Sequence, residues 1–304
     1  MRHPSLYIRP FEPQDIETVA ALLDTRLVHD HVTAEWVREK TFGDPDYDGD
    51  CTLCGIESGR LVGFAQGIVR DVDGALQGWI KWFAIALDAE RRGVATALFE
   101  RIEGLMRRRG VQKVGIANSP PNYTMPGLDP RYTAAYVFLA GRGYRRVGDA
   151  FNMKCDLQAH AWDTSADEER LLAEGIAVRR AERTDLPAAM DHTRTHFPGW
   201  SREVAACFIR SPISLHIALE GGKVVGFAAY DANNLGMGWF GPMGTDPAYR
   251  RKGIGKVLLW RCLADQRKQG YREAIIPWVG PLAFYWRHCG AVVSRVFWKM
   301  EKEL

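Results

Sequence analysis

The stretch Arg250-Arg251-Lys252-Gly253-Ile254-Gly255 separates two segments with different hydrophobic patterns. Residues 238–245, which precede it, are typical of a strand. After it, apolar residues recur at the 3.6-residue spacing of a helix: Ile254, Val257, Leu258 and Cys262. A basic turn between a strand and a helix predicts an anion site. Its glycines let the backbone approach a ligand, and the unpaired N–H groups and dipole of the helix start favour negative charge.

The same arrangement occurs earlier in the chain, where Glu90-Arg91-Arg92-Gly93-Val94-Ala95 follows the strand-like residues 79–85. A helical pattern follows this turn too, carried by Val94, Leu98, Phe99, Ile102 and Leu105. Two further segments match in the same order: residues 8–16 resemble 178–186, and residues 59–65 resemble 222–228. The offset drifts from 170 residues to 163 and then 160. Three ordered matches predict a duplicated domain.

The repeat sets the predicted domain organisation. The first copy spans residues 1–160, the polar and acidic residues 161–175 form a linker, and the second copy spans residues 176–304. Each copy is predicted to be a mixed α/β domain, in which helices flank a central mixed, mostly antiparallel sheet. Asp15 and Asp185 occupy matching places and are candidate helix N-caps.

Length and composition agree with two soluble domains. The chain has 304 residues, 46% of them hydrophobic, and 40 Lys and Arg against 37 Asp and Glu. Because it has no long basic block and no uncharged apolar stretch of about 18 residues, we expect neither a nucleic-acid nor a membrane partner. Residues 1–7 have no signal-peptide core, and only six cysteines are spread along the chain. These features predict a cytoplasmic protein with a small-molecule partner, as a monomer or homodimer.

No metal site is expected. Cys51 and Cys54 form a lone CxxC in what reads as a buried strand, and no second pair of ligands stands at zinc-site spacing. His29-Asp30-His31 lacks a further ligand and is interpreted as surface.

The second turn resembles the Q/R-x-x-G-x-G/A motif of the GCN5-related N-acetyltransferases (GNAT), and the ordered repeat extends this resemblance over nearly the whole chain. The resemblance implies a tandem protein that uses acetyl-CoA as co-substrate. The turn, Arg250, Arg251, Lys252, Gly253, Ile254 and Gly255 with Lys256 after it, would hold the pyrophosphate. Met243, Gly244 and Thr245 would lie along the pantetheine arm, and a bulge at Gly241-Pro242 would open the sheet for the thioester.

The resemblance also implies a catalytic acid. In the family, a tyrosine on the helix after the fifth strand usually protonates the departing thiolate, and Tyr285 in Phe284-Tyr285-Trp286 is assigned to this role. Tyr285 stands five residues before Gly290, whereas the commonest spacing in the family is four. The alternative role for Tyr285 is that of an aromatic ring packed beside Phe284. Phe138 occupies the matching place in the first copy. With Glu90 at the Q/R position, this predicts a degenerate N-terminal copy. The alternative is that the polar loop Asn122-Tyr123-Thr124 serves a different chemistry there.

No residue stands out as the general base. His192, His196 and Asp191 precede residues 197–200, a segment that lines the acceptor site in this fold, and a water relay or no base is equally acceptable. The resemblance implies an acetyl-CoA-dependent N-acetyltransferase. It would act on a primary amine of a small molecule by direct attack in a ternary complex, in the C-terminal domain. Alternatives are a non-catalytic CoA-binding sensor or scaffold, or an acyltransferase that uses another acyl-CoA.

Overall fold

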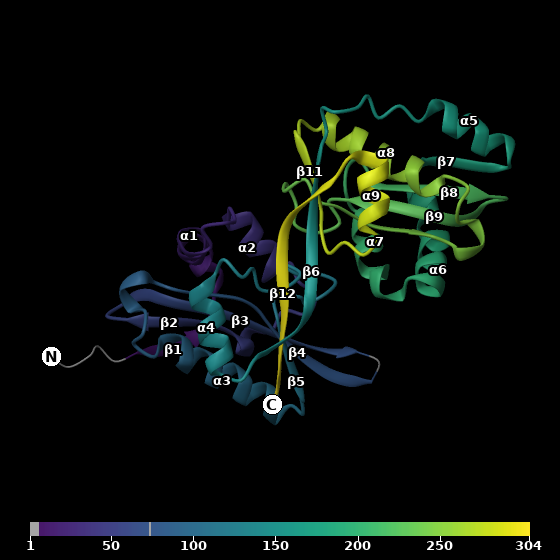
Figure 1. Cartoon of the computed structure of the whole chain (residues 1–304). Helices are drawn as coiled ribbons and strands as arrows, with labels where there is room; N and C mark the ends of the chain where they lie inside the picture. The colour runs from purple at the N-terminus through teal and green to yellow at the C-terminus, as the bar shows by residue number, and fades with distance from the viewer. Residues whose placement is uncertain (1–5, 73) are drawn as a thin grey trace. The chain divides into compact units, whose positions relative to one another are not determined.

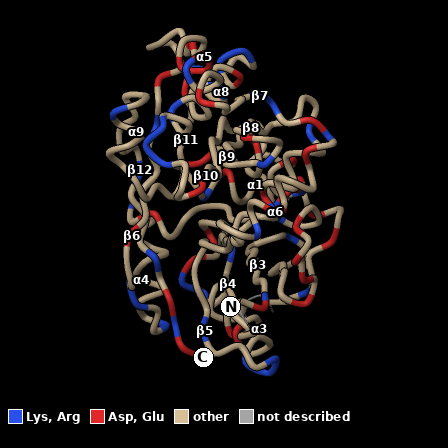
Figure 2. The backbone as a smooth tube through the Cα atoms, turned by 90° about the vertical axis from the view of Figure 1, so that its right-hand side faces the viewer, with Lys and Arg blue, Asp and Glu red and all other residues tan. Residues whose placement is uncertain are grey.

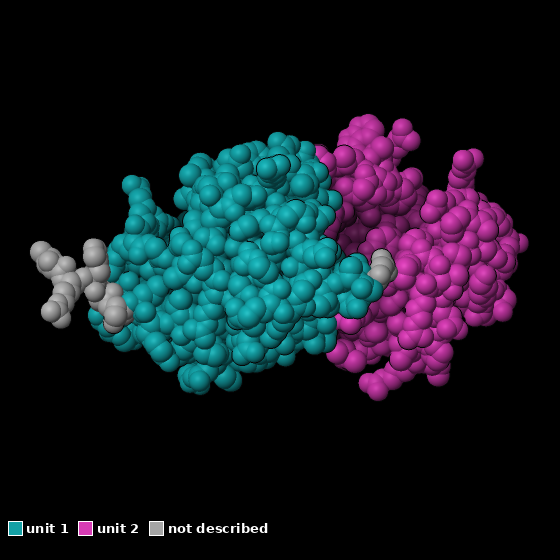
Figure 3. All heavy atoms as spheres, turned by 90° about the horizontal axis from the view of Figure 1, so that it is seen from below, with its two compact units in different colours: residues 1–150, 297–304 teal, residues 151–296 magenta. Residues whose placement is uncertain are grey.

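A computed structural model describes residues 6–72 and 74–304, so most of the N-terminal stretch 1–7 considered above lies outside the described residues. The chain divides into two compact units (Figure 3). Unit 1 comprises residues 1–150 together with 297–304, and unit 2 comprises residues 151–296. The predicted domain boundaries at residues 160 and 176 stay predictions, although the segment 161–175 contains a helix.

Unit 1 contains a mixed sheet in the order β1-β2-β3-β4-β5. Its elements are β1 (Tyr7–Pro10), α1 (Ile16–Arg26), α2 (Ala34–Lys40), β2 (Thr52–Glu57), β3 (Arg60–Val72), β4 (Ala75–Ile85), α3 (Val94–Arg108), β5 (Lys113–Ile116), α4 (Thr133–Gly141) and the first part of β6 (Arg145–Asp156). Only β4 and β5 are parallel among the pairs in this order. The end of β12 (Val292–Glu303), the last strand of the chain, adds antiparallel to β5.

The two faces of this sheet have different coverings (Figure 1). Helix α3 lies directly on the backbone of β3, because a Cβ atom added to Gly63 or Gly67 would come within 2.7 Å of Val94 or 2.6 Å of Ile102. Helix α4 packs beside α3 on this face, whereas α1 and α2 cover the other. Of the residues predicted to form the buried face of α3, only Leu105 is half-buried and the others are buried.

Unit 2 repeats this plan with the antiparallel sheet β7-β8-β9-β10. Its elements are α5 (Ser165–Ala173), β7 (Ile176–Arg180), α6 (Leu186–His196), α7 (Ser201–Cys207), β8 (Leu215–Glu220), β9 (Lys223–Tyr230), β10 (Phe240–Thr245), α8 (Ile254–Lys268), β11 (Glu273–Ile276) and α9 (Leu282–Cys289). Strand β11 runs antiparallel to the end of β6 and parallel to β10, which it meets at one bridge, Trp239–Ile275. The predicted fold class, two domains with mixed, mostly antiparallel sheets, is confirmed.

Helices flank both faces of the unit 2 sheet. Ile254 and Leu258 of α8 lie over Gly226 of β9, and the neighbouring Phe227 faces the opposite way, with its ring 5.7 Å from that of Phe197 after α6. All four residues predicted to form the buried face of α8 are buried.

Asp15 and Asp185 stand at the N-cap positions of α1 and α6, as predicted, but their side chains make no capping bond to these helices. Each carboxylate instead accepts hydrogen bonds from an arginine of the preceding strand, Arg9 or Arg179. Each carboxylate also accepts a hydrogen bond from the backbone N–H of Glu12 or Glu182, in the capping box of the short 3-10 turn that leads into the helix. The two residues thus stand at the predicted positions, but their side chains do not cap α1 and α6.

Charged residues of both signs are spread over the elements of both units (Figure 2). Among the residues that the structure describes, no helix is long and apolar enough to cross a membrane.

The position of β12 predicts that the last residues of the chain stabilise the first unit. Met300 is fully buried in the unit 1 core, so Met300→Ala should lower the free energy of unfolding of unit 1 by about 2–5 kcal/mol. Hydrogen exchange should show faster exchange of the β5 amides. Met153→Ala, which truncates a buried methionine of the unit 2 core, is the matched control and should affect β11 instead. If either variant made the amides of β5 and β11 exchange faster to the same extent, the pairing of β12 with β5 would be contradicted.

Candidate functional site

The two turns have nearly the same backbone conformation. Gly253 (φ 87°) and Gly93 (φ 85°) are left-handed and directly precede α8 and α3, and Arg251 (φ 68°) and Arg91 (φ 57°) are left-handed two residues earlier. This conformation ends each turn at a helix whose first N–H groups have no partner within the helix. Both turns therefore present a helix N-terminus behind a basic loop, which is a favourable place for an anion.

Strand β10 leads to the C-terminal turn along an open edge. It pairs with β9 on one side, and beyond the bridge at Trp239 no described residue continues its pairing with β11. The register with β9 shifts between Phe240 and Met243, so the predicted bulge at Gly241-Pro242 is confirmed. The backbone groups of Met243, Gly244 and Thr245 that point away from β9 can therefore bind an extended ligand.

The cationic side chains predicted around the C-terminal turn differ in the contacts that they make. Among the described residues, Arg250 and Arg251 have no side-chain partner, and the Lys252 ammonium lies 5.5 Å from the ring centre of Tyr249. Lys256 is directed elsewhere: its Nζ atom donates to Asp167 of α5 at 2.7 Å. Two arginines are thus left available at the turn.

A further cation at the turn, Arg170, was not predicted from the sequence. One of its terminal nitrogens donates to the Lys252 carbonyl at 2.9 Å and lies 2.8 Å from the place that a Cβ on Gly253 would occupy. Arg170 belongs to α5, in the segment predicted to be a linker. No motif marks this residue, because its position depends on how α5 packs beside the turn.

Tyr285 lies on α9, close to the start of β10. Its ring centre is 6.1 Å from that of Phe240 and 5.2 Å from that of Phe284, whose ring in turn lies over Gly255 at the start of α8. Burial raises the pKa of the phenol, so it stays protonated at neutral pH. No described residue accepts a hydrogen bond from its hydroxyl. The position allows a proton donor, and that role stays a prediction.

The candidates for a general base differ in environment. His192 is buried, which lowers its pKa to about 4 and keeps the ring neutral. The Nε2 atom of His196 lies 3.4 Å from a carboxylate oxygen of Asp246, at the end of β10, and Asp191 is exposed on α6. These contacts do not single out one of the three.

In unit 1, Glu90 is ion-paired with Arg26 of α1, so its charge is compensated within the unit. Helices α4 and α9 both end before a left-handed glycine, Gly143 or Gly290, and the residues five positions earlier are Phe138 and Tyr285. The Phe138 ring packs against the Phe99 ring of the core, with 5.0 Å between centres. Unit 1 therefore has no phenol at this position.

Unit 1 instead places a buried lysine where its parallel strands separate. Pairing of β4 with β5 ends at Ile80, and the register of β4 with β3 shifts there, which leaves Lys81 in a bulge. Lys81 precedes Gly93 by the same 12 residues that separate Gly241 from Gly253. The glycine of one bulge is thus a lysine in the other.

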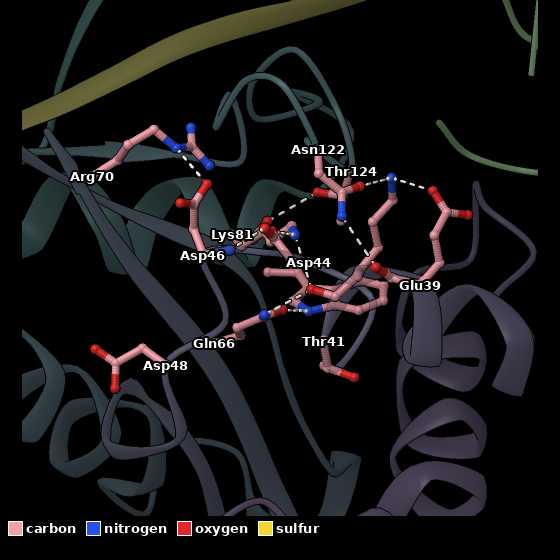
Figure 4. Close-up of polar contacts among 12 residues, drawn as sticks. Glu39, Thr41, Asp44, Asp46, Asp48, Gln66, Arg70, Lys81, Asn122 and Thr124 are labelled. Carbon is pink, nitrogen blue, oxygen red and sulfur yellow. Dashed lines mark hydrogen bonds and ion pairs between the residues drawn. The ribbon is translucent and has the colours of Figure 1, made fainter. Parts of the chain in front are cut away.

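The Lys81 side chain is fully buried and held by the loop after α2 (Figure 4). Its Nζ atom donates to Asp44 at 2.5 Å and to the Lys40 carbonyl at 2.8 Å. Burial lowers the pKa of Lys81 to about 7; Asp44 opposes this effect, and the cations Lys40 and Arg70 add to it.

A polar cluster surrounds this lysine (Figure 4). Lys40 is also fully buried and donates to Glu39 and Asn122, at 2.9 and 2.6 Å. Gln66 donates to the Lys40 carbonyl at 2.8 Å, and Thr124 donates to the Lys81 carbonyl at 2.9 Å. Asn122 and Thr124 belong to the polar loop around Tyr123 that the sequence marked for a different chemistry. Lys81, Lys40 and Gln66 were not predicted, although a charge inside the apolar run 79–83 is a signal that could have been used.

Within residues 6–72 and 74–304, no group of three or more His, Cys, Asp or Glu side chains is placed to hold a metal ion. Cys51 and Cys54 are buried thiols, and desolvation raises the pKa of each to about 12.

Solved structures with this fold include several acetyltransferases. The chain aligns over 98% of its length with a glucosamine N-acetyltransferase region of a fungal multi-domain GH3 β-N-acetylglucosaminidase, with a TM-score of 0.83 and 17% identity, and spans 38% of that chain. A GCN5-related N-acetyltransferase from Sphaerobacter thermophilus gives 0.71 and 20% identity, covering 98% of this chain and 95% of the other. A tandem GNAT protein of the clavulanic acid pathway gives 0.67 and 14%, covering 98% of both. At these identities the similarity shows the fold alone.

No curated protein matches the sequence significantly. The sequence model of the Acetyltransferase (GNAT) family, however, matches twice, at residues 17–125 and 176–290. Together the two matches cover more than half of the chain and include both turns. The chain therefore belongs to the GNAT acetyltransferase family, as a member with two tandem domains.

Proposed function

We propose that the protein is an acetyl-CoA-dependent N-acetyltransferase whose reaction takes place in unit 2. The observation that carries this proposal is the open edge of β10 leading into the C-terminal turn. A pantetheine arm can hydrogen-bond to the edge at Met243, Gly244 and Thr245, and the pyrophosphate can then reach the start of α8. Arg250 and Arg251, with Arg170 beside them, supply positive charge for it.

The acceptor is proposed to be a primary amine of a small molecule. Its neutral nitrogen attacks the thioester carbonyl directly, so that a C–N bond forms as the C–S bond breaks. The thiolate takes a proton from Tyr285, and the nitrogen releases one to solvent or to a nearby base. Tyr285 suits this role because its buried phenol stays protonated and has no competing partner among the described residues.

One further feature supports a reducing compartment, and another suggests which acceptor to test. All six cysteines are unpaired and buried, which agrees with the cytoplasm. The glucosamine N-acetyltransferase region among the similar structures makes an amino sugar the first acceptor to test in a panel of amines.

CoA binding tests the placement of the co-substrate. Arg251→Glu should raise the Kd for CoA about tenfold or more in calorimetry, because a charge-assisted bond to phosphate contributes about 1.5–3 kcal/mol. Arg91→Glu reverses the charge at the matching position of unit 1 and should leave the Kd unchanged. An unaltered Kd in Arg251→Glu, or the loss of binding in Arg91→Glu alone, would place CoA elsewhere.

Turnover tests the acid. Tyr285→Phe should lower kcat by about 10²–10⁴-fold, because the thiolate must then leave without a proton, and should leave the Kd for CoA nearly unchanged. Phe284→Leu, which changes the adjacent ring without removing a hydroxyl, is the control for packing. Steady-state kinetics with an accepted amine measure both variants. Equal kcat in Tyr285→Phe and the wild type would remove Tyr285 from the mechanism.

A further inference from the structure

Arg70 on β3 has hydrogen-bonding capacity that the protein does not use. Its Nε atom donates to Asp46 at 2.7 Å, and its guanidinium carbon lies 5.4 Å from the ring centre of Trp79. Both terminal amino groups are buried and have no hydrogen-bond partner among the described residues. A guanidinium is charged at any physiological pH, and buried donors are nearly always paired. The two amino groups together form the fork that binds a carboxylate.

Other unpaired polar atoms lie in the segment after β5, where the chain separates from β4. Ser119 Oγ and Asn118 Oδ1 are buried and have no partner among the described residues. A Cβ on Gly115 would come within 2.9 Å of Asn118 Oδ1 and 2.8 Å of the Trp79 ring. Trp79 therefore contacts Arg70 and also lies beside Asn118. One small region holds unused donors and an unused acceptor.

Lys81 adjoins the same region. The backbone N–H of Asp46 donates to Asp44 at 2.9 Å, so the Lys81–Asp44 pair and the Arg70–Asp46 pair are joined through one short loop (Figure 4). The Lys81 nitrogen has two hydrogen-bond partners within the described part of the chain and can make a third bond. Fixing the loop to the sheet accounts for the paired groups of the cluster, but not for the two Arg70 amino groups, Asn118 Oδ1 or Ser119 Oγ.

We propose that unit 1 has a binding site of its own for a small carboxylic acid that also carries a hydroxyl or amino group. The carboxylate binds the two amino groups of Arg70 and the amine of Lys81, with the Ser119 hydroxyl as a further donor. Asn118 Oδ1 accepts a hydrogen bond from the second group of the ligand. The site lies in the other unit from the proposed CoA turn and does not depend on that assignment.

Ligand-observed NMR titrations of the full chain with acetate, glycolate and inorganic phosphate test this site. Glycolate should bind more tightly than acetate, because its hydroxyl can donate to Asn118. Arg70→Lys keeps a cation beside Asp46 but lacks the fork, and it should raise the Kd for glycolate about tenfold. Lys81→Met should also weaken binding. Arg60→Lys, on the same strand but exposed and paired with Asp88, is the matched control and should not change the Kd.

The titrations distinguish a carboxylate site from a phosphate site and from the absence of a site. Thermal melting checks that each variant folds, and Arg70→Lys is the decisive one because it preserves the ion pair. The proposal is overturned by an unchanged Kd in Arg70→Lys, or by no binding of either carboxylate at about 10 mM. Tighter binding of phosphate than of glycolate would overturn the carboxylate assignment. CoA affinity measured on the same samples is an independent readout, since neither substitution touches the C-terminal turn.

Discussion

The separation of two parallel strands is the constraint on which both units depend. In unit 2, β10 and β11 meet at one bridge, and in unit 1, β4 and β5 stop pairing at Ile80. From there on, no strand of the described part of the chain pairs with that edge of the preceding strand. A bulge coincides with the separation in both units, and the strand then leads through a left-handed glycine into a helix. An extended ligand with an anionic end is complementary to an edge that finishes at a helix N-terminus.

The two units place different chemistry at the point of separation. In unit 2 the bulge contains Gly241 and Pro242, which have no polar side chains, and the nearby Tyr285 remains protonated through burial. In unit 1 the bulge contains Lys81, and a buried ammonium is costly unless a carboxylate and hydrogen bonds compensate it. Asp44 and the Lys40 carbonyl supply that compensation. The same backbone plan thus has residues without polar side chains at the bulge of one copy and a buried lysine at the bulge of the other.

The sequence was sufficient to predict the duplication, both turns, the bulge at Gly241-Pro242 and the buried face of α8. These features depend on local patterns or on comparison of the copies. Lys81 was not predicted because side chains of a regular strand alternate between the two faces of the sheet. A bulge adds one residue, so the alternation no longer tells which face a side chain after it occupies. Arg170 and the end of β12 were not predicted because their partners lie far away in the sequence, and hydrophobic periodicity does not identify partners.

The predicted degeneration of the first copy would account for Phe138 but not for the polar cluster. A pocket that has lost its function can be filled with apolar side chains at no cost in hydrogen bonds, whereas each buried unpaired donor costs about 1–3 kcal/mol. Within residues 6–72 and 74–304, Arg70, Asn118 and Ser119 nevertheless keep buried atoms without a hydrogen-bond partner. The turn of unit 1 also retains its backbone conformation, with Glu90 compensated by Arg26. A ligand that hydrogen-bonds to these atoms would remove the free-energy cost of leaving them unpaired. The composition of the cluster is therefore that of a binding site, and not that of a former pocket filled with apolar side chains.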